Sequence, residues 1–277
     1  MLQDISPLRL DNSYSPDLKP EASDLIFHFE NATVLSCADV EQPFPALSQL
    51  GRVKSSIYLF TIGEHRYFLA LDEKLPPAEG FRYVNVKKLR YAEGALNVNV
   101  MALFTAYHLA GWYRDNRCCG SCGSKTVPDA AERALLCTGC CRIIYPRINP
   151  AVIVGVTNGD RLLITRYAKN RNFAYDALVA GFTEIGETFE ETVAREVSEE
   201  VGLRVKNIRY YKSQPWGYSG SILAGFFCDV DGSDSVCLDE SELSSAVWTE
   251  RSGITGQPDG FSLTNDMMMA FKEGKNV

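Results

Sequence analysis

The chain has 277 residues, a formal net charge of −7 and 45% hydrophobic residues. This length suits one large domain or two smaller ones with an ample core. The acidic balance argues against broad electrostatic attraction to nucleic acid, so an anionic substrate would need a local cation. No apolar run is long enough to span a bilayer, and we expect no membrane partner. The N-terminus lacks the basic start and apolar stretch of a signal peptide, which predicts a cytoplasmic protein.

The first third of the chain has a strand-like pattern. Ile57–Ile62 and Tyr67–Leu71 are rich in β-branched and aromatic residues and flank Gly63–Arg66, which predicts a hairpin. Apolar residues at helical spacing follow over 98–114. We therefore expect residues 1–117 to form a β-rich N-terminal domain that ends in a helix.

Six of the nine cysteines lie between residues 118 and 141. A secreted disulfide framework would spread them more evenly, so the clustering indicates a metal site in a reducing compartment. Two pairs with two-residue spacing have fourteen residues between them, namely Cys119 with Cys122 and Cys137 with Cys140. Four thiolates on such turns can close a tetrahedron around Zn²⁺, which predicts a zinc ribbon with one structural zinc ion per chain.

Other interpretations of the cysteines stay open. The thiols could be buried without a metal, and Cys118 or Cys141 could be alternative ligands, although their positions break the two-residue spacing. A closed four-sulfur site leaves no open position for catalysis. Zinc ribbons also bind nucleic acid, but the segment between the two pairs has only Lys125 and Arg133 as cations. We expect the ribbon to span residues 118–147.

Residues 148–277 are predicted to form a mixed α/β domain. Pro146 and Pro150 mark its boundary. Two β-rich runs then surround Asn158-Gly159-Asp160, which is a strong hairpin signal. The pattern predicts further strands at 177–180, 205–211, 222–230 and 246–248, and helices at 189–201 and 264–273.

The predicted helix at 189–201 carries a cluster of carboxylates and follows a glycine-bearing loop. Thr188 to Glu191 match a capping box, so the helix should begin near Phe189. Gly202 fits just past its end. Glu200 falls beside the apolar stripe of this helix, where a carboxylate is poorly solvated and needs a cation or a shifted pKa.

The remaining carboxylates of this segment can be divided by position. Glu190 and Glu191 suit a solvated acidic face, and Glu187 before the helix is a structural partner for Arg195. Glu200 lies four residues after Glu196 and shares its face of the helix, and Glu199 lies three residues after Glu196. They offer the oxygen-only ligands that Mg²⁺ or Mn²⁺ prefers, an arrangement used in phosphoryl transfer.

These residues also match a long and specific pattern. Its specified positions are Gly181, Glu187, Arg195, Glu196, Val197, Glu199, Glu200, Gly202 and Leu203. The segment resembles the signature of the Nudix hydrolases. The resemblance implies an α/β/α sandwich with a mixed sheet for residues 148–277. It also implies hydrolysis of a nucleoside diphosphate linked to another moiety, with divalent metals on the signature glutamates.

A zinc ribbon directly before such a domain, behind a β-rich N-terminal domain, resembles the NADH pyrophosphatase (NAD diphosphatase) family. Two short motifs beside the cysteines also look like that family, one at Ala106, Leu109 and Trp112 and one over Tyr145–Pro150. The resemblance implies hydrolysis of NADH or NAD to nicotinamide mononucleotide and AMP, and removal of NAD caps from RNA. It further implies a homodimer whose aromatic loop helps the neighbouring subunit's site.

A third motif departs from the family. Members carry Ser-Gln-Pro-Trp-Pro-Phe-Pro-x-Ser, associated with NADH preference, whereas Ser213–Ser221 here has Gly217 and Ser219 in place of the two later prolines. Proline fixes φ and glycine frees it, so we expect a less preorganised loop. A Nudix pyrophosphatase for ADP-ribose, FAD or a dinucleoside polyphosphate therefore stays open, as does a non-enzymatic ribbon module with a vestigial Nudix domain.

The resemblance assigns roles residue by residue. Glu196, Glu200 and Glu242 match metal ligands together with the carbonyl of Ala180. For the attacking water, our hypothesis is that Glu199 orients or deprotonates it. From sequence alone Glu242 could equally be a solvated acid, and the aromatic residues below could be core residues. The matching substrate-contacting positions are Glu132, Tyr145, Phe182, Gln214, Pro215, Trp216, Gly217, Tyr218, Ser219, Gly220, Ser221 and Thr264.

Overall fold

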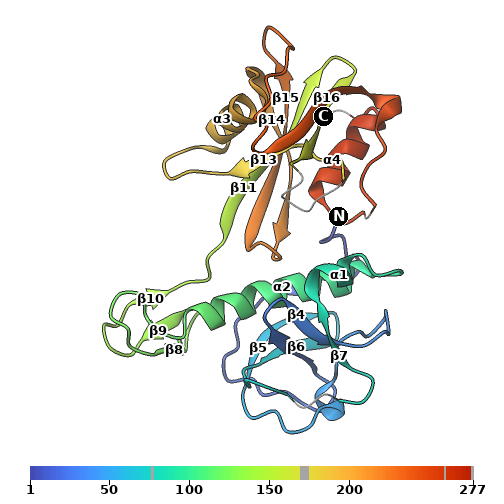
Figure 1. Cartoon of the computed structure of the whole chain (residues 1–277). Coiled ribbons are helices and arrows are strands. Elements are labelled where there is room, and N and C mark those ends of the chain that lie inside the picture. Colours follow the sequence, from blue (N-terminus) through green and yellow to red (C-terminus); the bar gives the residue numbers. More distant parts are fainter. Residues whose placement is uncertain (76–77, 169–174, 259, 276–277) are drawn as a thin grey trace. The chain divides into compact units, whose positions relative to one another are not determined.

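The structure is a computed structural model that describes residues 1–75, 78–168, 175–258 and 260–275. Its chain divides into two compact units, which we describe separately (Figure 1). The N-terminal unit comprises Gln3–Arg147 and Gly217–Gly220, and the C-terminal unit comprises Met1–Leu2, Ile148–Trp216 and Ser221–Val277.

The N-terminal unit contains two small sheets. One has the order β1-β5-β6-β2, and the other has β4 between β3 and β7. The predicted hairpin is confirmed, because β5 and β6 pair from Ile62 and His65 across a turn in which Gly63 has a φ of 60°. The strands are β1 (Leu10–Asp11), β2 (Leu25–Phe27), β3 (Phe29–Glu30), β4 (Thr33–Ser36), β5 (Ser56–Ile62), β6 (His65–Ala70) and β7 (Arg82–Asn85).

Helices follow these sheets in the chain. The short α1 (Val86–Arg90) begins where the Asn85 side chain accepts a hydrogen bond from the backbone N–H of Lys87, which is the role expected of an N-cap asparagine. Earlier in the chain, between β4 and β5, the 3-10 turn η1 covers Leu47–Gln49. The long α2 (Asn97–Asp115) matches the predicted 98–114 helix within a residue at each end and buries much of its apolar surface.

The cysteine knuckle forms a three-stranded antiparallel sheet in the order β10-β9-β8. These strands are short. Cys119 and Cys122 lie before β8, Cys137 ends β9 and Cys140 lies in the turn between β9 and β10. Their bounds are β8 (Thr126–Pro128), β9 (Leu135–Cys137) and β10 (Ile143–Ile144).

The C-terminal unit contains a six-stranded mixed sheet. Its order is β14-β15-β11-β12-β16, with β13 paired to β11, and β11 and β15 run parallel. The predicted hairpin at Gly159 is confirmed by the pairing of Asn158 with Arg161. The strands are β11 (Asn149–Asn158), β12 (Arg161–Tyr167), β13 (Val179–Phe182), β14 (Val205–Trp216), β15 (Ser221–Val230) and β16 (Leu243–Glu250).

Two strand predictions were displaced. The strand expected at 177–180 lies at 179–182, because Ala177 makes only an isolated bridge to Thr165 before the chain pairs with β11. The strand expected at 205–211 continues to Trp216, because its long partner β15 keeps pairing as far as Ser221.

Two helices cover the two faces of this sheet (Figure 1). Along β11 the side chains alternate: Val152 and Val154 pack with α3 (Phe189–Val201), while Ile153 packs with α4 (Leu263–Lys272). The short 3-10 turn η3 covers Arg251–Gly253. This α/β/α sandwich is the predicted fold. Among the residues described, no helix combines the length and apolarity needed to cross a membrane.

Candidate functional site

The carboxylate helix α3 has the ends that its sequence predicts. The Thr188 hydroxyl accepts a hydrogen bond from the backbone N–H of Glu191 at 3.2 Å, and the Glu191 carboxylate accepts one from the Thr188 N–H at 2.8 Å. Gly202 ends the helix with a φ of 68°, in the left-handed region that favours glycine. These two caps fix which side chains lie on the inner face.

Arg195 connects the loop before α3 to the helix. Its Nε and Nη2 donate to the two carboxylate oxygens of Glu187 at 2.5 and 2.8 Å, and Nη2 also donates to the carbonyl of Phe182 at 3.0 Å. The predicted structural pair is therefore confirmed. Hydrogen bonding from Arg195 lowers the pKa of Glu187 to about 2.

The same guanidinium also holds two of the predicted catalytic carboxylates. Its Nη1 donates to Glu196 at 2.7 Å and to Glu199 at 2.9 Å. The sequence indicated Arg195 only as a partner of Glu187, because contacts between neighbouring and i, i+4 residues depend on rotamers that spacing does not fix. Arg195 thus orients the loop and both carboxylates at once.

Glu196 lies directly against strand β13. A Cβ atom added at Gly181 would fall 1.9 Å from Cδ of Glu196, so only glycine fits opposite this carboxylate. The Glu196 side chain is 12% exposed. Burial raises its pKa, and although Arg195 opposes that shift, the charges of Glu199 and Glu242 act in the same direction as burial. Glu242 is therefore close enough to contribute to the same electrostatic environment.

Glu200 is the most buried of the signature glutamates, with 3% of its surface exposed. This agrees with its predicted place beside the apolar stripe, and a charged carboxylate in such a position needs a compensating cation. Glu199 differs, because its side chain is 59% exposed. Ala180 precedes Gly181 on β13 and pairs with Ile153 of β11.

The segment that carries Glu242 is attached to the end of α3. The backbone N–H of Cys237 donates to the carbonyl of Val201 at 2.9 Å, and that of Asp239 donates to the carbonyl of Glu200 at 3.0 Å. Asp239 also accepts the N–H and hydroxyl of Ser241, forming an Asx turn before Glu242. The sequence analysis did not use Asp239, although Asp-x-Ser is a recognisable turn signal.

The carboxylate oxygens of the described residues do not lie close enough together to form a complete set of metal ligands. Among the described residues, the group of four thiols is the one set of three or more such ligands whose atoms all lie within 4.8 Å of one another. The carboxylates still suit a hard divalent cation, because they offer oxygen ligands only and two of them, Glu196 and Glu200, are largely buried. The donor set therefore fits Mg²⁺ or Mn²⁺ chemically.

The cysteine knuckle brings its four predicted ligands together. The Sγ atoms of Cys119 and Cys140 lie 3.7 Å apart, and those of Cys122 and Cys137 lie 3.4 Å apart. Backbone N–H groups of the turns donate to these sulfurs. Hydrogen bonds from the backbone and the side chain of Ser124 lower the pKa of the Cys122 thiol to about 6. The four-thiol group could bind zinc, and Cys118 and Cys141 are exposed outside it.

Glu132 and Tyr145, both predicted to contact substrate, form a pair in the N-terminal unit. The Tyr145 hydroxyl donates to the Glu132 carboxylate at 2.7 Å. The Tyr145 ring is 55% exposed. The structure thus brings these two residues together at a surface where the ring remains accessible.

Gln214 occupies a different environment from that of a surface loop residue. Its side chain is fully buried, its Nε2 donates to the carbonyl of Phe261 and its Oε1 accepts the N–H of Leu263, each at 2.7 Å. The amide therefore holds the start of α4. Ser221 is also buried, Pro215 is exposed, and Trp216 and Thr264 are half-buried.

The turn Gly217–Gly220 belongs to the N-terminal unit. The Tyr218 ring stacks on Tyr107 with centroids 6.1 Å apart and planes at 18°, and a Cβ added at Gly217 would fall 2.1 Å from the carbonyl oxygen of Phe104. Glycine is thus required by close packing, which the expectation of a looser loop did not include. Ser219 and Gly220 complete the turn, and Ser219 is exposed.

Phe182 is not a core residue. Its side chain is 54% exposed, at the end of β13 just before the loop that leads to α3. The sequence left open whether this aromatic residue is buried or available, and the structure supports the second interpretation.

Comparison with known proteins agrees with this arrangement. Residues 147–266 match the family model described as NUDIX domain. The chain is 45% identical over 140 residues to the NAD-capped RNA hydrolase NudC of Enterobacter sp. (strain 638), covering 50% of this chain and 54% of the relative. It is 44% identical, with the same coverage, to the NAD-capped RNA hydrolase NudC of Shigella dysenteriae serotype 1 (strain Sd197).

The chain spans about half the length of the curated relatives it matches. A crystal structure of a NUDIX hydrolase from Nitrosomonas europaea is also similar, with 20% identity, a TM-score of 0.48, and coverage of 58% of this chain and 95% of that one. Residues 147–266 of this chain are therefore similar to the NUDIX domain, with the carboxylate helix α3 near the centre of the match.

Proposed function

We propose that this protein hydrolyses the diphosphate bond of NADH or NAD to give nicotinamide mononucleotide and AMP, and that it removes NAD caps from RNA. The observation that carries the proposal is the complete carboxylate set of α3, with Glu196 against Gly181 and Glu200 buried behind it. The similarity to NAD-capped RNA hydrolases across the NUDIX domain supports the substrate class.

The proposed metal ligands are Glu196, Glu200, Glu242 and the carbonyl of Ala180. Their support is the oxygen-only chemistry, the burial of Glu196 and Glu200, and the electrostatic influence of Glu242 on Glu196. A bound Mg²⁺ or Mn²⁺ ion neutralises diphosphate oxygens and lowers the pKa of a water molecule.

Glu199 is the proposed base. Its carboxylate is exposed enough to reach solvent, while the hydrogen bond from Arg195 limits its orientation. The water oxygen forms a bond to phosphorus, the bond from phosphorus to the bridging oxygen breaks, and one water proton passes to a Glu199 carboxylate oxygen. Glu187 acts only through Arg195 and keeps the guanidinium in place.

The four thiols of Cys119, Cys122, Cys137 and Cys140 are proposed to hold one structural Zn²⁺ ion per chain. Their mutual distances support this, and a site closed by four sulfurs offers no position for substrate. Zinc would therefore stabilise the knuckle and take no part in hydrolysis.

Recognition of the dinucleotide is proposed to use exposed aromatic rings and the polar groups near them. In the C-terminal unit, the exposed Phe182 and the half-buried Trp216 are proposed as stacking surfaces. In the N-terminal unit, considered by itself, Tyr145 and Glu132 are proposed to offer a ring and a carboxylate. The other proposed substrate-contacting residues are Gly217–Gly220 in the N-terminal unit and Gln214, Pro215, Ser221 and Thr264 in the C-terminal unit, where buried Gln214 holds the start of α4. A cytoplasmic homodimer remains a prediction of the sequence.

Two measurements test the proposal together. Wild-type protein is assayed with NADH, NAD, NAD-capped RNA, ADP-ribose, FAD and a dinucleoside polyphosphate, with Mg²⁺ and with Mn²⁺. Preferred hydrolysis of NADH, NAD or the capped RNA is expected. Preferred hydrolysis of another nucleotide would show that the proposed substrate is wrong. No turnover of any of these compounds would overturn the proposal that the protein is an enzyme.

Glu200→Gln is then assayed at saturating Mg²⁺. It removes a buried charge without changing side-chain size, and we expect turnover to fall at least about a hundredfold. Glu190→Gln, in the exposed first turn of the same helix, is the matched control. Wild-type turnover by Glu200→Gln would overturn the assignment of the metal site.

A further inference from the structure

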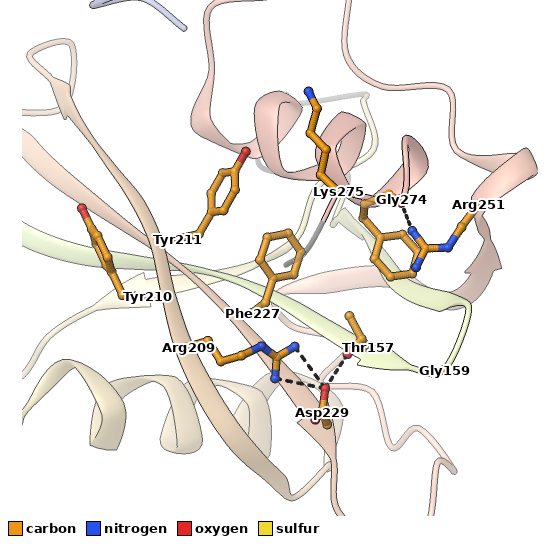
Figure 2. Close-up of a pocket in the computed structure, with 11 residues that line it drawn as sticks. Thr157, Gly159, Arg209, Tyr210, Tyr211, Phe227, Asp229, Arg251, Gly274 and Lys275 are labelled. Carbon is orange, nitrogen blue, oxygen red and sulfur yellow. Dashed lines mark hydrogen bonds and ion pairs between the residues drawn. The ribbon is translucent and has the colours of Figure 1, made fainter.

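A cavity of about 790 Å³ lies in the C-terminal unit, apart from the carboxylates of α3 (Figure 2). Its lining includes Phe271 of α4 and Phe227, which belong to the same core cluster on the opposite face of the sheet from α3. None of the predicted catalytic, metal-binding or substrate-contacting residues lines it. The cavity therefore requires an explanation separate from the catalytic site.

Three cations line this cavity in a chain whose net charge is −7. They are Arg209, Arg251 and Lys275, and the accompanying carboxylate is Asp229. Figure 2 shows that Asp229 accepts hydrogen bonds from Arg209 and from the hydroxyl of Thr157, the latter at 2.9 Å. Asp229 offsets the charge of Arg209, whereas Arg251 and Lys275 pair with Asp160 and Glu273, two exposed carboxylates outside the lining.

Arg251 is held in a way that leaves it able to bind a ligand. Its Nε donates to Asp160 at 3.0 Å, its Nη1 donates to the carbonyl of Phe271, and its Cζ lies 4.1 Å from the centre of the Phe271 ring. Nη2 makes no hydrogen bond to a residue that the structure describes. Asp160 is 88% exposed, so solvent weakens its hold on the guanidinium.

Lys275 adds a more exposed charge to the same lining. Its side chain is 66% exposed and its Nζ lies 2.6 Å from the Glu273 carboxylate, which is itself 49% exposed. An exposed ion pair of this kind contributes little and can be exchanged for a stronger anion. A phosphate group, which carries more charge than one carboxylate, fits that role.

Aromatic rings form another part of the lining. Tyr211 and Phe227 meet edge to face, with centroids 5.3 Å apart and planes at 87°. The Tyr211 hydroxyl donates to Asp266 at 2.8 Å, which fixes the orientation of the ring. Phe227 is itself only 1% exposed, so its role is to support Tyr211, whose half-buried ring is available to a ligand beside the guanidinium and ammonium groups. The size of the cavity lies within the range of roughly 300–1,000 Å³ found for small-molecule sites.

We propose that this cavity is a second ligand site, which binds a mononucleotide with its phosphate at Arg251, Arg209 and Lys275 and its base against the half-buried ring of Tyr211. The site is independent of the proposed hydrolysis, because no residue is shared with the carboxylate cluster. The chemical class follows from the lining: cations select the phosphate, and the ring of Tyr211 favours a planar base.

Isothermal titration of the full-length chain with AMP, adenosine and inorganic phosphate tests the proposal. Buffer without divalent metal is used, so that the acidic catalytic face has no cation with which to hold phosphate. We expect AMP to bind at one site per chain, inorganic phosphate to bind more weakly, and adenosine to give no measurable heat. No binding of AMP, or equal binding of adenosine, would overturn the proposal.

Matched variants locate the phosphate end. Arg251→Gln is compared with Arg161→Gln, because Arg161 also pairs with an aspartate at 2.9 Å and lies over an aromatic ring, but outside the cavity. Arg251→Gln should weaken AMP about tenfold by removing a charge-assisted hydrogen bond. Equal AMP affinity in the two variants would overturn the assignment.

A second pair of variants covers the case in which Arg251→Gln fails to fold. Lys275→Gln should weaken AMP about threefold, whereas Lys206→Gln, whose lysine pairs with Asp231 outside the cavity, should have no measurable effect. Identical AMP affinities for these two variants would contradict a phosphate site at Lys275.

Substitutions of Tyr211 test the base end. Tyr211→Leu removes the ring and should weaken AMP while leaving phosphate affinity unchanged, and Tyr211→Phe, which keeps the ring, should retain AMP affinity. If Tyr211→Leu binds AMP as wild type does, the site binds phosphate without recognising a base and the mononucleotide assignment is wrong.

Discussion

In the cysteine knuckle, four sulfurs lie within 4.8 Å of one another, whereas the carboxylates of Glu196 and Glu199 in α3 are held by the guanidinium of Arg195. Both groups were predicted to bind cations. The thiols are brought together by backbone turns, whose N–H groups already stabilise negative charge on sulfur. The carboxylates instead depend on a side chain for their arrangement.

This difference follows from what each site has to do. Neutral thiols can be packed together at small electrostatic cost and ionise as the metal binds. Carboxylates repel one another at neutral pH, and burying them without a cation is unfavourable. Arg195 supplies an internal cation for Glu187, Glu196 and Glu199, which keeps an acidic helix compatible with folding.

The largest effect is expected from breaking the thiol group. Cys137→Ser removes one buried ligand, and because metal binding is coupled to folding in such sites, the knuckle should lose both zinc and its fold. Zinc content by elemental analysis and proteolysis within residues 118–147 measure this. Cys141→Ser, which alters an exposed cysteine outside the group, should retain one zinc ion; equal zinc content in the two variants would refute the ligand set.

Gly181→Ala tests the close contact in the carboxylate site. The added Cβ would overlap Glu196, so the carboxylate must move, and we expect Mn²⁺ affinity to fall about 10- to 100-fold. Titration of activity with Mn²⁺ gives the apparent affinity. Gly260→Ala is the control, since a Cβ there meets no atom within 4 Å. Unchanged Mn²⁺ dependence in Gly181→Ala would show that the contact does not constrain Glu196.

Arg195→Lys keeps the charge but loses the fork of hydrogen bonds. A lysine cannot hold Glu187, Glu196 and Glu199 in the same geometry, so kcat should fall about tenfold with a smaller change in KM. Steady-state kinetics at saturating metal measure the two constants. Arg204→Lys, at an exposed position after α3, controls for the substitution itself. A change confined to KM would argue against a positioning role.

The smallest effect is expected from Glu187→Gln, and it is measured as the dependence of thermal stability on pH. The pKa of Glu187 in the folded protein is about 2, below its usual value of 4.5. Its pairing with Arg195 therefore stabilises the fold above about pH 4.5, and this contribution is lost as the pH falls towards 2. The Tm of wild type should exceed that of the variant near neutral pH and approach it near pH 2; a constant difference across this range would contradict the pairing.

The parts of the fold that local chemistry determines could be predicted. The capping box and Gly202 predicted both ends of α3, and the turn at Gly159 predicted the hairpin between β11 and β12. The first residues of β13 were displaced, since strand partners distant in sequence decide where pairing starts.

The candidate site shows the same limit. Residue spacing indicated the buried position of Glu200 and the pairing of Glu187 with Arg195. It could not indicate that Gly217 is required by the carbonyl of Phe104, because that contact joins residues more than a hundred positions apart. The cavity at Arg251 was also missed, since its lining comes from segments without a shared motif.

The division of the chain has a practical consequence. The C-terminal unit is assembled from three stretches of sequence, and it includes Leu2, which is fully buried and whose N–H donates to the carbonyl of Phe261 at 2.8 Å. A fragment cut at residue 148 would expose the surface that Leu2 covers. Fragments used to study hydrolysis in isolation should therefore be supplied with the first residues of the chain as a separate peptide, and recovery of solubility on its addition would report how much that short segment stabilises the NUDIX domain.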